Sequence, residues 1–224
     1  MGLVVFDLDG TLIDTAPDLA FAMNRVLSEE GLAEIALAEA RVFVGHGARA
    51  MIERGLVKAG SAFDEARARA LTRRFIEIYT AHIADESRPF PGALAALDRL
   101  EAAGHRLAIC TNKREELART LFDALGLTQR FAAIVGGNTV GVPKPDPAPL
   151  LETIRLAGGG PAIMVGDSAT DVGAARNAKI PVIGVPFGYT DTPIAELAPD
   201  RIVDHFDALP DAVDALFQET APLA

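Results

Sequence analysis

The feature that most constrains the fold is a series of short, uninterrupted apolar runs separated by helical patterns. The runs that we interpret as strands are residues 3–6, 106–110, 132–135, 162–165, 182–185 and, more weakly, 201–203. Because these runs are continuous rather than alternating in hydropathy, they are typical of parallel strands covered on both faces. Leucines at helical spacing lie between most of them. The pattern predicts an α/β fold with a doubly wound parallel sheet, a Rossmann-like core.

One long stretch, residues 15–88, interrupts this alternation between the first and second strands. It holds no strand candidate, and apolar residues recur along it at helical spacing, among them Leu19, Met23 and Val26. It is far longer than an ordinary connection. Pro89 and the pair Pro91-Gly92 mark the return of the chain. We therefore expect a catalytic core of residues 1–14 and 89–224, with a small all-helical cap, residues 15–88, inserted after the first strand.

Charge and composition exclude several classes of partner. The formal net charge is −10, so the overall basic footprint of a nucleic-acid-binding protein is absent, and binding to an anionic membrane surface is disfavoured. No apolar stretch approaches the roughly 20 residues that cross a bilayer. The N-terminus lacks the cationic region of a signal peptide, and the single cysteine, Cys110, cannot form an internal disulfide. We expect a cytoplasmic protein, monomer or homodimer.

The first chemical motif is Asp7-Leu8-Asp9-Gly10-Thr11, directly after the first strand. Side chains two apart on an extended segment point the same way, so Asp7 and Asp9 share a side. They lie at the carboxyl end of a strand, where open α/β sheets bind ligands. Two crowded carboxylates are costly unless a cation or a proton lies between them. The alternative is a polar loop whose aspartate caps a helix.

Three further motifs follow other strands or precede one. Thr111-Asn112 follows the second strand and could hold phosphate oxygens or simply cap the next helix. Lys144 lies among three prolines in Pro143-Lys144-Pro145-Asp146-Pro147, which favours a rigidly presented cation over a mobile surface lysine. Asp167 and Asp171 follow the strand of residues 162–165, one helical turn apart, with Ser168 as a possible N-cap.

In a parallel sheet these motifs meet at one edge. The site would then combine carboxylates, one lysine, one hydroxyl and one amide. Carboxylate and carbonyl oxygens suit Mg²⁺, and a metal beside a lysine suits a phosphate group.

This set of motifs resembles the haloacid dehalogenase-like superfamily, and most of all its bacterial phosphoglycolate phosphatase branch. The four motifs occur in the family's order, and the helical insertion is similar to the family's C1-type cap. The resemblance implies an enzyme, a phosphoric monoester hydrolase. It also implies Mg²⁺ as cofactor and a small phosphorylated metabolite, most of all 2-phosphoglycolate, as partner.

The resemblance also implies roles for individual residues. Asp7 would be the nucleophile that becomes an aspartyl phosphate, and Asp9 would be the general acid and then the base. Mg²⁺ would be held by Asp7, by the backbone carbonyl of Asp9 and by Asp167. The phosphate-binding residues would be Thr111, Asn112 and Lys144. Asp171 would orient Lys144 or metal-bound water, and Ser168 would lie behind the reacting groups with it.

A candidate specificity loop lies in the expected cap, where Gly45 and Gly47 flank His46. His46 or Arg49 could supply the cation that a two-carbon substrate with a carboxylate needs. The alternative is a helix start with a solvated arginine.

Other functions remain open at this stage. A β-phosphoglucomutase-like phosphotransferase of the same superfamily would share the first step, and pyrophosphate or nucleotides could be substrates of a hydrolase. A phospho-receiver signalling domain also combines an aspartyl phosphate, Mg²⁺, a threonine and a lysine on an α/β sheet. Its acceptor follows a central strand, and it lacks a helical insertion.

Overall fold

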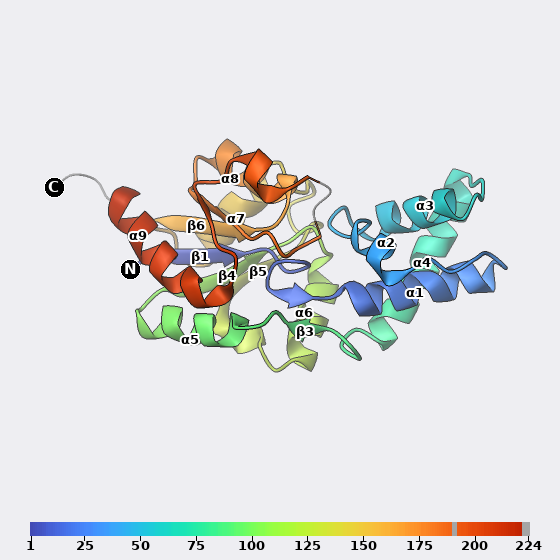
Figure 1. Ribbon diagram of the computed structural model, residues 1–224, viewed down its shortest axis with the longest axis horizontal. Helices are drawn as coiled ribbons and strands as arrows, with labels where there is room; N and C mark the ends of the chain where they lie inside the picture. Colours follow the sequence, from blue (N-terminus) through green and yellow to red (C-terminus); the bar gives the residue numbers. More distant parts are fainter. Residues whose placement is uncertain (190–191, 221–224) are drawn as a thin grey trace.

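The computed structural model describes residues 1–189 and 192–220, and within them six strands form one sheet (Figure 1). All neighbouring strands pair in parallel, in the spatial order β5 (Phe131–Val135), β4 (Arg106–Cys110), β1 (Leu3–Phe6), β6 (Ala162–Gly166), β7 (Val182–Gly184) and β8 (Arg201–Ile202). The chain adds strands first to one side of β1 and then to the other. The predicted doubly wound sheet is confirmed, and each expected strand is found to within one residue at either end.

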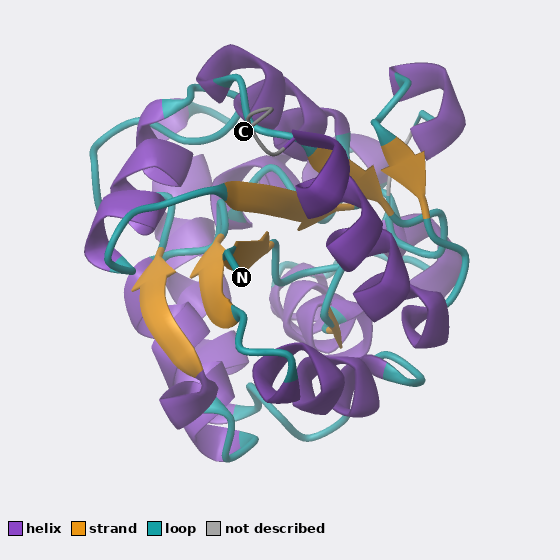
Figure 2. Ribbon diagram, turned by 90° about the vertical axis from the view of Figure 1, so that its left-hand side faces the viewer, coloured by secondary structure: helices purple, strands orange, loops and turns teal. Residues whose placement is uncertain are grey.

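Helices cover both faces of this sheet (Figures 1 and 2). One face carries α5 (Ala93–Ala102), α6 (Glu115–Ala124) and α9 (Leu209–Thr220), and the other carries α7 (Ala148–Leu156) and α8 (Ala169–Ala178). Side chains of β1 alternate between the two apolar clusters, Val4 and Phe6 facing one and Leu3 and Val5 the other. Short 3₁₀ turns complete the described elements: η1 (Thr128–Arg130), η2 (Ile194–Leu197) and η3 (Phe206–Ala208).

The expected cap consists of helices beyond the carboxyl end of β1 (Figure 1). They are α1 (Ala16–Glu29), α2 (Leu37–Arg41), α3 (Ala48–Lys58) and α4 (Glu65–Ala81). Helix α4 packs between α1 and α3 through a buried stripe that includes Leu71, Phe75 and Tyr79. The spacing of these residues places them on one side of the helix, as the sequence indicates.

A two-stranded ribbon joins the cap to the sheet domain. Strand β2 (Ile13–Asp14) pairs antiparallel with β3 (Arg88–Pro89), so the outgoing and returning chains are held side by side. Neither strand is predicted from the sequence, because two residues are too few to show a hydropathy period. The boundaries that we assigned to the cap, residues 15 and 88, stay a prediction.

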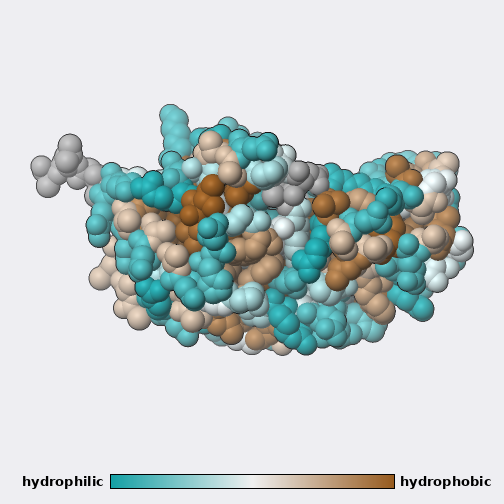
Figure 3. Space-filling view, in the orientation of Figure 1, coloured by the Kyte–Doolittle hydropathy of each residue, from teal (hydrophilic) through white to brown (hydrophobic). Residues whose placement is uncertain are grey.

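In the part of the chain that the structure describes, no helix is both long and apolar enough to cross a bilayer. On the face drawn in Figure 3, hydrophilic residues alternate with smaller groups of apolar ones over both the sheet domain and the cap.

A buried carboxylate fastens the first helix of the cap to the returning chain. Asp18, in the first turn of α1, is only 2% exposed. Its Oδ2 accepts hydrogen bonds from the backbone N–H of Ser87 (2.8 Å) and from the Ser87 hydroxyl (2.7 Å), and its Oδ1 accepts one from the N–H of Glu86 (3.0 Å). These bonds join residues nearly 70 positions apart in the chain.

We expect Asp18→Ala to lower the free energy of unfolding by about 3 kcal/mol, because it leaves the buried Ser87 donors without an acceptor. Urea denaturation measures this loss. Glu34→Ala, at an exposed acid of the cap, is the control and should change the value by less than about 0.5 kcal/mol. Equal, small effects of the two substitutions would show that the Asp18 contact does not stabilise the fold.

Candidate active site

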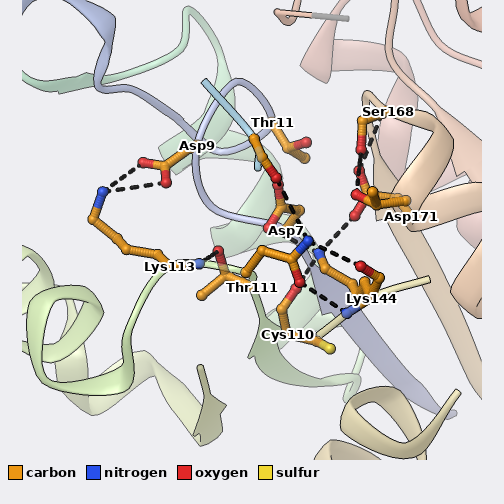
Figure 4. A network of polar contacts seen from close by, with 12 residues as sticks. Asp7, Asp9, Thr11, Cys110, Thr111, Lys113, Lys144, Ser168 and Asp171 are labelled. Carbon is orange, nitrogen blue, oxygen red and sulfur yellow. Dashed lines mark hydrogen bonds and ion pairs between the residues drawn. The ribbon is translucent and has the colours of Figure 1, made fainter. Parts of the chain in front are cut away.

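The structure brings the chemical motifs together at the carboxyl edge of the sheet (Figure 4). Asp7 follows β1, Thr111 follows β4, and Asp167 follows β6. Lys144 lies in the loop between β5 and α7. All four residues are buried, each at most 7% exposed.

The ammonium group of Lys144 lies at the centre of this cluster. Its Nζ donates to Oδ1 of Asp7 (2.9 Å), to Oδ1 of Asp171 (2.6 Å) and to the backbone carbonyl of Cys110 (2.6 Å). Burial alone would lower the pKa of Lys144, but the charges of Asp171 and Asp7 raise it above its ordinary value. Lys144 is therefore a permanent cation beside the Asp7 carboxylate.

Asn112 fixes the loop that carries Lys144. Its Oδ1 accepts from the backbone N–H of Lys144 (2.8 Å), and its Nδ2 donates to the Lys144 carbonyl (3.1 Å). The neighbouring Thr111 is 2% exposed, and its Oγ1 accepts the backbone N–H of Lys113 (3.2 Å). The side chain of Asn112 thus positions the lysine, while both residues line the pocket in which we expect the phosphate group.

Three carboxylates form a cluster that could hold a cation. One oxygen from each of Asp7, Asp167 and Asp171 lies within 4.8 Å of the others. Burial, followed by the charges of Asp171 and Asp7, raises the pKa of Asp167 to about 8. Burial, opposed by Lys144, raises the pKa of Asp7 to about 6. Ionising all three together is costly with one lysine as counter-ion, so this oxygen set fits a hard divalent cation such as Mg²⁺.

The members of this cluster are held in different ways. Asp167 accepts from the hydroxyl of Thr11 (2.7 Å) and from the backbone N–H of Tyr189 (2.8 Å). Both oxygens of Asp171 are hydrogen-bonded within the protein. Its Oδ1 accepts from Lys144, and its Oδ2 accepts from the backbone N–H and the hydroxyl of Ser168. Asp171 thus joins Ser168 to Lys144, and the expected role of these two residues stays a prediction.

Asp9 lies apart from the three-carboxylate cluster and binds a second lysine (Figure 4). Its oxygens accept from Nζ of Lys113, at 2.9 and 3.2 Å, and Oδ1 also accepts from the hydroxyl of Thr15 (2.6 Å). The metal contact expected of Asp9 is made by its backbone carbonyl. The position of its side chain does not test that expectation, which stays a prediction.

Gly10 allows the two acidic loops to approach each other. Its φ is +83°, a conformation that L side chains rarely adopt, and a Cβ there would lie 2.7 Å from Oδ2 of Asp167. A larger residue would force apart the loops that carry Asp7 and Asp167.

A pocket of about 270 Å³ opens between this cluster and the cap. The sheet domain contributes Asp7, Asp9 and Lys144, and the cap contributes residues from α3, α4 and the loop that holds His46. His46 also lines a second, smaller cavity of about 140 Å³ that reaches Asp167. The positive φ values of Gly45 (+99°) and Gly47 (+86°) let this loop bend over the site.

Arg49, the other candidate of the cap, also lines the larger pocket, but its guanidinium is already bound. It pairs with Glu53 (2.7 Å) and with Glu65 (2.5 Å), and its side chain is 48% exposed. The structure therefore leaves His46 as the less constrained of the two side chains over the site.

Two buried residues near the site were not identified from the sequence. Lys113 directly follows Thr111-Asn112, and a cation at that position after a strand was an available signal. Tyr189 gives no such local signal. Its backbone binds Asp167, its hydroxyl binds Asp14 and accepts from the N–H of Ala16, and the Arg41 guanidinium lies over its ring. Tyr189 therefore connects the acidic cluster to the start of the cap.

Comparison with known proteins identifies the family. A model of the haloacid dehalogenase-like hydrolase family matches residues 4–185, which include every motif described above. The chain belongs to this family. It is accordingly an enzyme, and the names of its curated relatives place it among the phosphoric monoester hydrolases.

The relatives of this chain match it over nearly its whole length. A phosphoglycolate phosphatase of Mesorhizobium japonicum is 51% identical over 92% of each chain. One of Agrobacterium fabrum is 49% identical over 97% of this chain and 93% of that protein. A crystal structure described as a predicted phosphoglycolate phosphatase from Haemophilus somnus has a TM-score of 0.86 at 30% identity, covering 94% of this chain and 97% of that one.

Proposed function

We propose that this enzyme is a Mg²⁺-dependent phosphatase that hydrolyses 2-phosphoglycolate through an aspartyl phosphate on Asp7. The observation that carries the proposal is the placement of the Asp7 carboxylate. It lies at the wall of the pocket, bound by Lys144 and next to Asp167 and Asp171. The names of the relatives at 40–51% identity support the choice of substrate.

The proposed reaction has two steps. In the first, a carboxylate oxygen of Asp7 forms a bond to phosphorus while the bond from phosphorus to the ester oxygen breaks. Asp9, after taking up a proton from water, gives that proton to the leaving alkoxide. In the second, Asp9 takes a proton from water, whose oxygen attacks phosphorus and releases inorganic phosphate and free Asp7. A bound Mg²⁺ would supply positive charge next to Asp7 and Asp167.

The need for cations follows from electrostatics. A carboxylate about 4 Å from a phosphate dianion is repelled by about 8 kcal/mol at an effective dielectric constant of 20. Uncompensated, that repulsion would slow the attack by about six orders of magnitude. Lys144 supplies one positive charge beside Asp7 and pairs with Asp171 as well, so a divalent ion is needed to offset the rest.

Metal binding is expected to stabilise the fold more as the pH rises. The pKa of Asp7, about 6, and that of Asp167, about 8, lie above their unfolded values. In the metal-free protein these groups therefore favour folding most when protonated, and that advantage is lost as the pH rises through both values. A cation offsets the loss, so the increase in Tm on adding Mg²⁺ should be small near about pH 5 and large near about pH 9.

Differential scanning fluorimetry with and without Mg²⁺ measures this trend. Asp167→Asn, which removes one titrating carboxylate, should flatten it. A Mg²⁺-induced increase in Tm that is larger in acid than in alkali would contradict the assignment of these carboxylates to the metal.

The substrate is tested by a screen of small phosphate esters with Mg²⁺ present. It includes 2-phosphoglycolate, β-glucose 1-phosphate, pyrophosphate and nucleoside monophosphates. We expect kcat/KM for 2-phosphoglycolate to exceed the others by at least about 10-fold. A requirement for a bisphosphate activator would identify a mutase instead. An aspartyl phosphate that persists without turnover would identify a receiver domain.

A further inference from the structure

The described lining of the larger pocket contains five side chains that can carry positive charge: His46, Arg49, Lys113, Arg114 and Lys144. Most of these side chains are already paired with acidic residues. Arg49 binds Glu53 and Glu65, Arg114 binds Glu116, and both are about half exposed. Lys144 binds the nucleophile and Asp171. Lys113 differs, because the acid that it binds in this structure is Asp9, the residue proposed to protonate the leaving group.

The environment of Lys113 is unusual for a lysine. Its side chain is 5% exposed, and its ammonium lies 4.6 Å from the centre of the Tyr79 ring of α4. The hydroxyl of Tyr79 is buried, and among the described residues it has no hydrogen-bond partner of normal geometry. A lysine is seldom buried unless its charge is paired. The chain therefore keeps this cation on the wall of the pocket, facing an acid that must also serve the reaction.

The spacing of the two charged groups matches the proposed substrate. Nζ of Lys113 lies 2.9 Å from Oδ1 of Asp9. In 2-phosphoglycolate the ester oxygen and the carboxylate are attached to the same carbon, so standard bond lengths put their oxygens about 3 Å apart. An ester oxygen that receives a proton from Asp9 therefore has its neighbouring carboxylate within reach of the Lys113 ammonium.

We propose that Lys113 binds the carboxylate of the substrate and so determines the preference for 2-phosphoglycolate over esters without an acid group. This inference rests on the proposed function. When the substrate enters, its carboxylate replaces Asp9 as the partner of Lys113, and Asp9 is left to face the ester oxygen. An ester without a carboxylate leaves Lys113 paired with Asp9, so Asp9 is not released to face the ester oxygen.

The test compares two substrates of the same length, 2-phosphoglycolate and ethyl phosphate, which lacks the carboxylate. For Lys113→Met we expect the ratio of their kcat/KM values to fall by on the order of 30-fold or more, because a charged hydrogen bond to one substrate only is lost. Lys113→Arg keeps the charge and should keep most of the preference. Arg114→Gln, at the neighbouring cation of the same pocket, should leave the ratio within about twofold.

The outcomes separate the two proposals. Equal losses on both substrates in Lys113→Met would show that Lys113 acts only by holding Asp9, and would overturn the inference while the phosphatase function stands. If His46→Gln loses the preference for 2-phosphoglycolate and Lys113→Met keeps it, the substrate carboxylate binds to the cap loop. That result would also overturn the inference while the phosphatase function stands. A wild-type enzyme without any preference for 2-phosphoglycolate would overturn both the inference and the proposed substrate.

Discussion

Replacing Asp7 by asparagine is expected to lower kcat by at least about 10⁴-fold, because the amide cannot form the bond to phosphorus. The fold should not suffer. Burial raises the pKa of Asp7 even against the charge of Lys144, and the charges of Asp171 and Asp9 add to the rise, so the neutral side chain removes repulsion within the cluster. The melting temperature of the metal-free variant should therefore equal or exceed that of the wild type.

Steady-state phosphate release and a thermal melt on the same preparation give both results. Asp204→Asn, the same chemical change on an exposed loop, is the matched control and should alter neither. Phosphate release at the normal rate by the Asp7 variant would refute its assignment as the nucleophile.

Lys144→Met is expected to have the largest effect on stability, a loss of about 3 to 5 kcal/mol in the presence of a chelator. The substitution leaves the buried carboxylates of Asp7 and Asp171 without the cation that lies within 2.9 Å of both. Because burial raises the pKa of Asp7, its carboxylate can escape the repulsion by taking up a proton, so the loss should be smaller in acid than in alkali. Turnover should fall as well, since the same ammonium offsets the charge of the phosphoryl group.

Urea denaturation at an acidic and an alkaline pH measures the loss. Lys58→Met is the control, because Lys58 is half exposed and pairs with Glu39 on the surface of the cap, so it should cost less than about 1 kcal/mol. Lys144→Arg should not restore stability, since a guanidinium does not fit between three acceptors placed for an ammonium. Similar small losses for Lys144→Met and Lys58→Met would contradict the proposed role.

The sheet and the acidic residues could be predicted because their signals are local. A continuous apolar run such as residues 3–6 indicates a buried strand, and the aspartate that follows it must lie at the strand end. The same reasoning placed Asp167 after its own strand. Parallel topology then brings the two ends together, whatever the length of the chain between them.

The rest of the site depends on contacts between segments that are distant in the sequence, and no local sequence pattern predicts such contacts. Thr11 binds Asp167 across 156 positions, and Lys113 binds Asp9 across 104. The hydrogen bonds from Ser87 to Asp18 likewise exist only once the cap has folded back. Asp18 and Ser87 show no signal of this contact in the sequence, because a buried partner rather than a neighbour gives each its role.

The most direct test of the account is a rapid-quench experiment with 2-phosphoglycolate labelled in its phosphate group. Acid quenching within the first turnover, followed by digestion and mass spectrometry, should find the phosphoryl group on Asp7 at a level that rises and then decays as phosphate is released. The Asp7→Asn variant should carry no label. Turnover in the wild type without any protein-bound phosphoryl group, or with the label on another residue, would contradict the central claim.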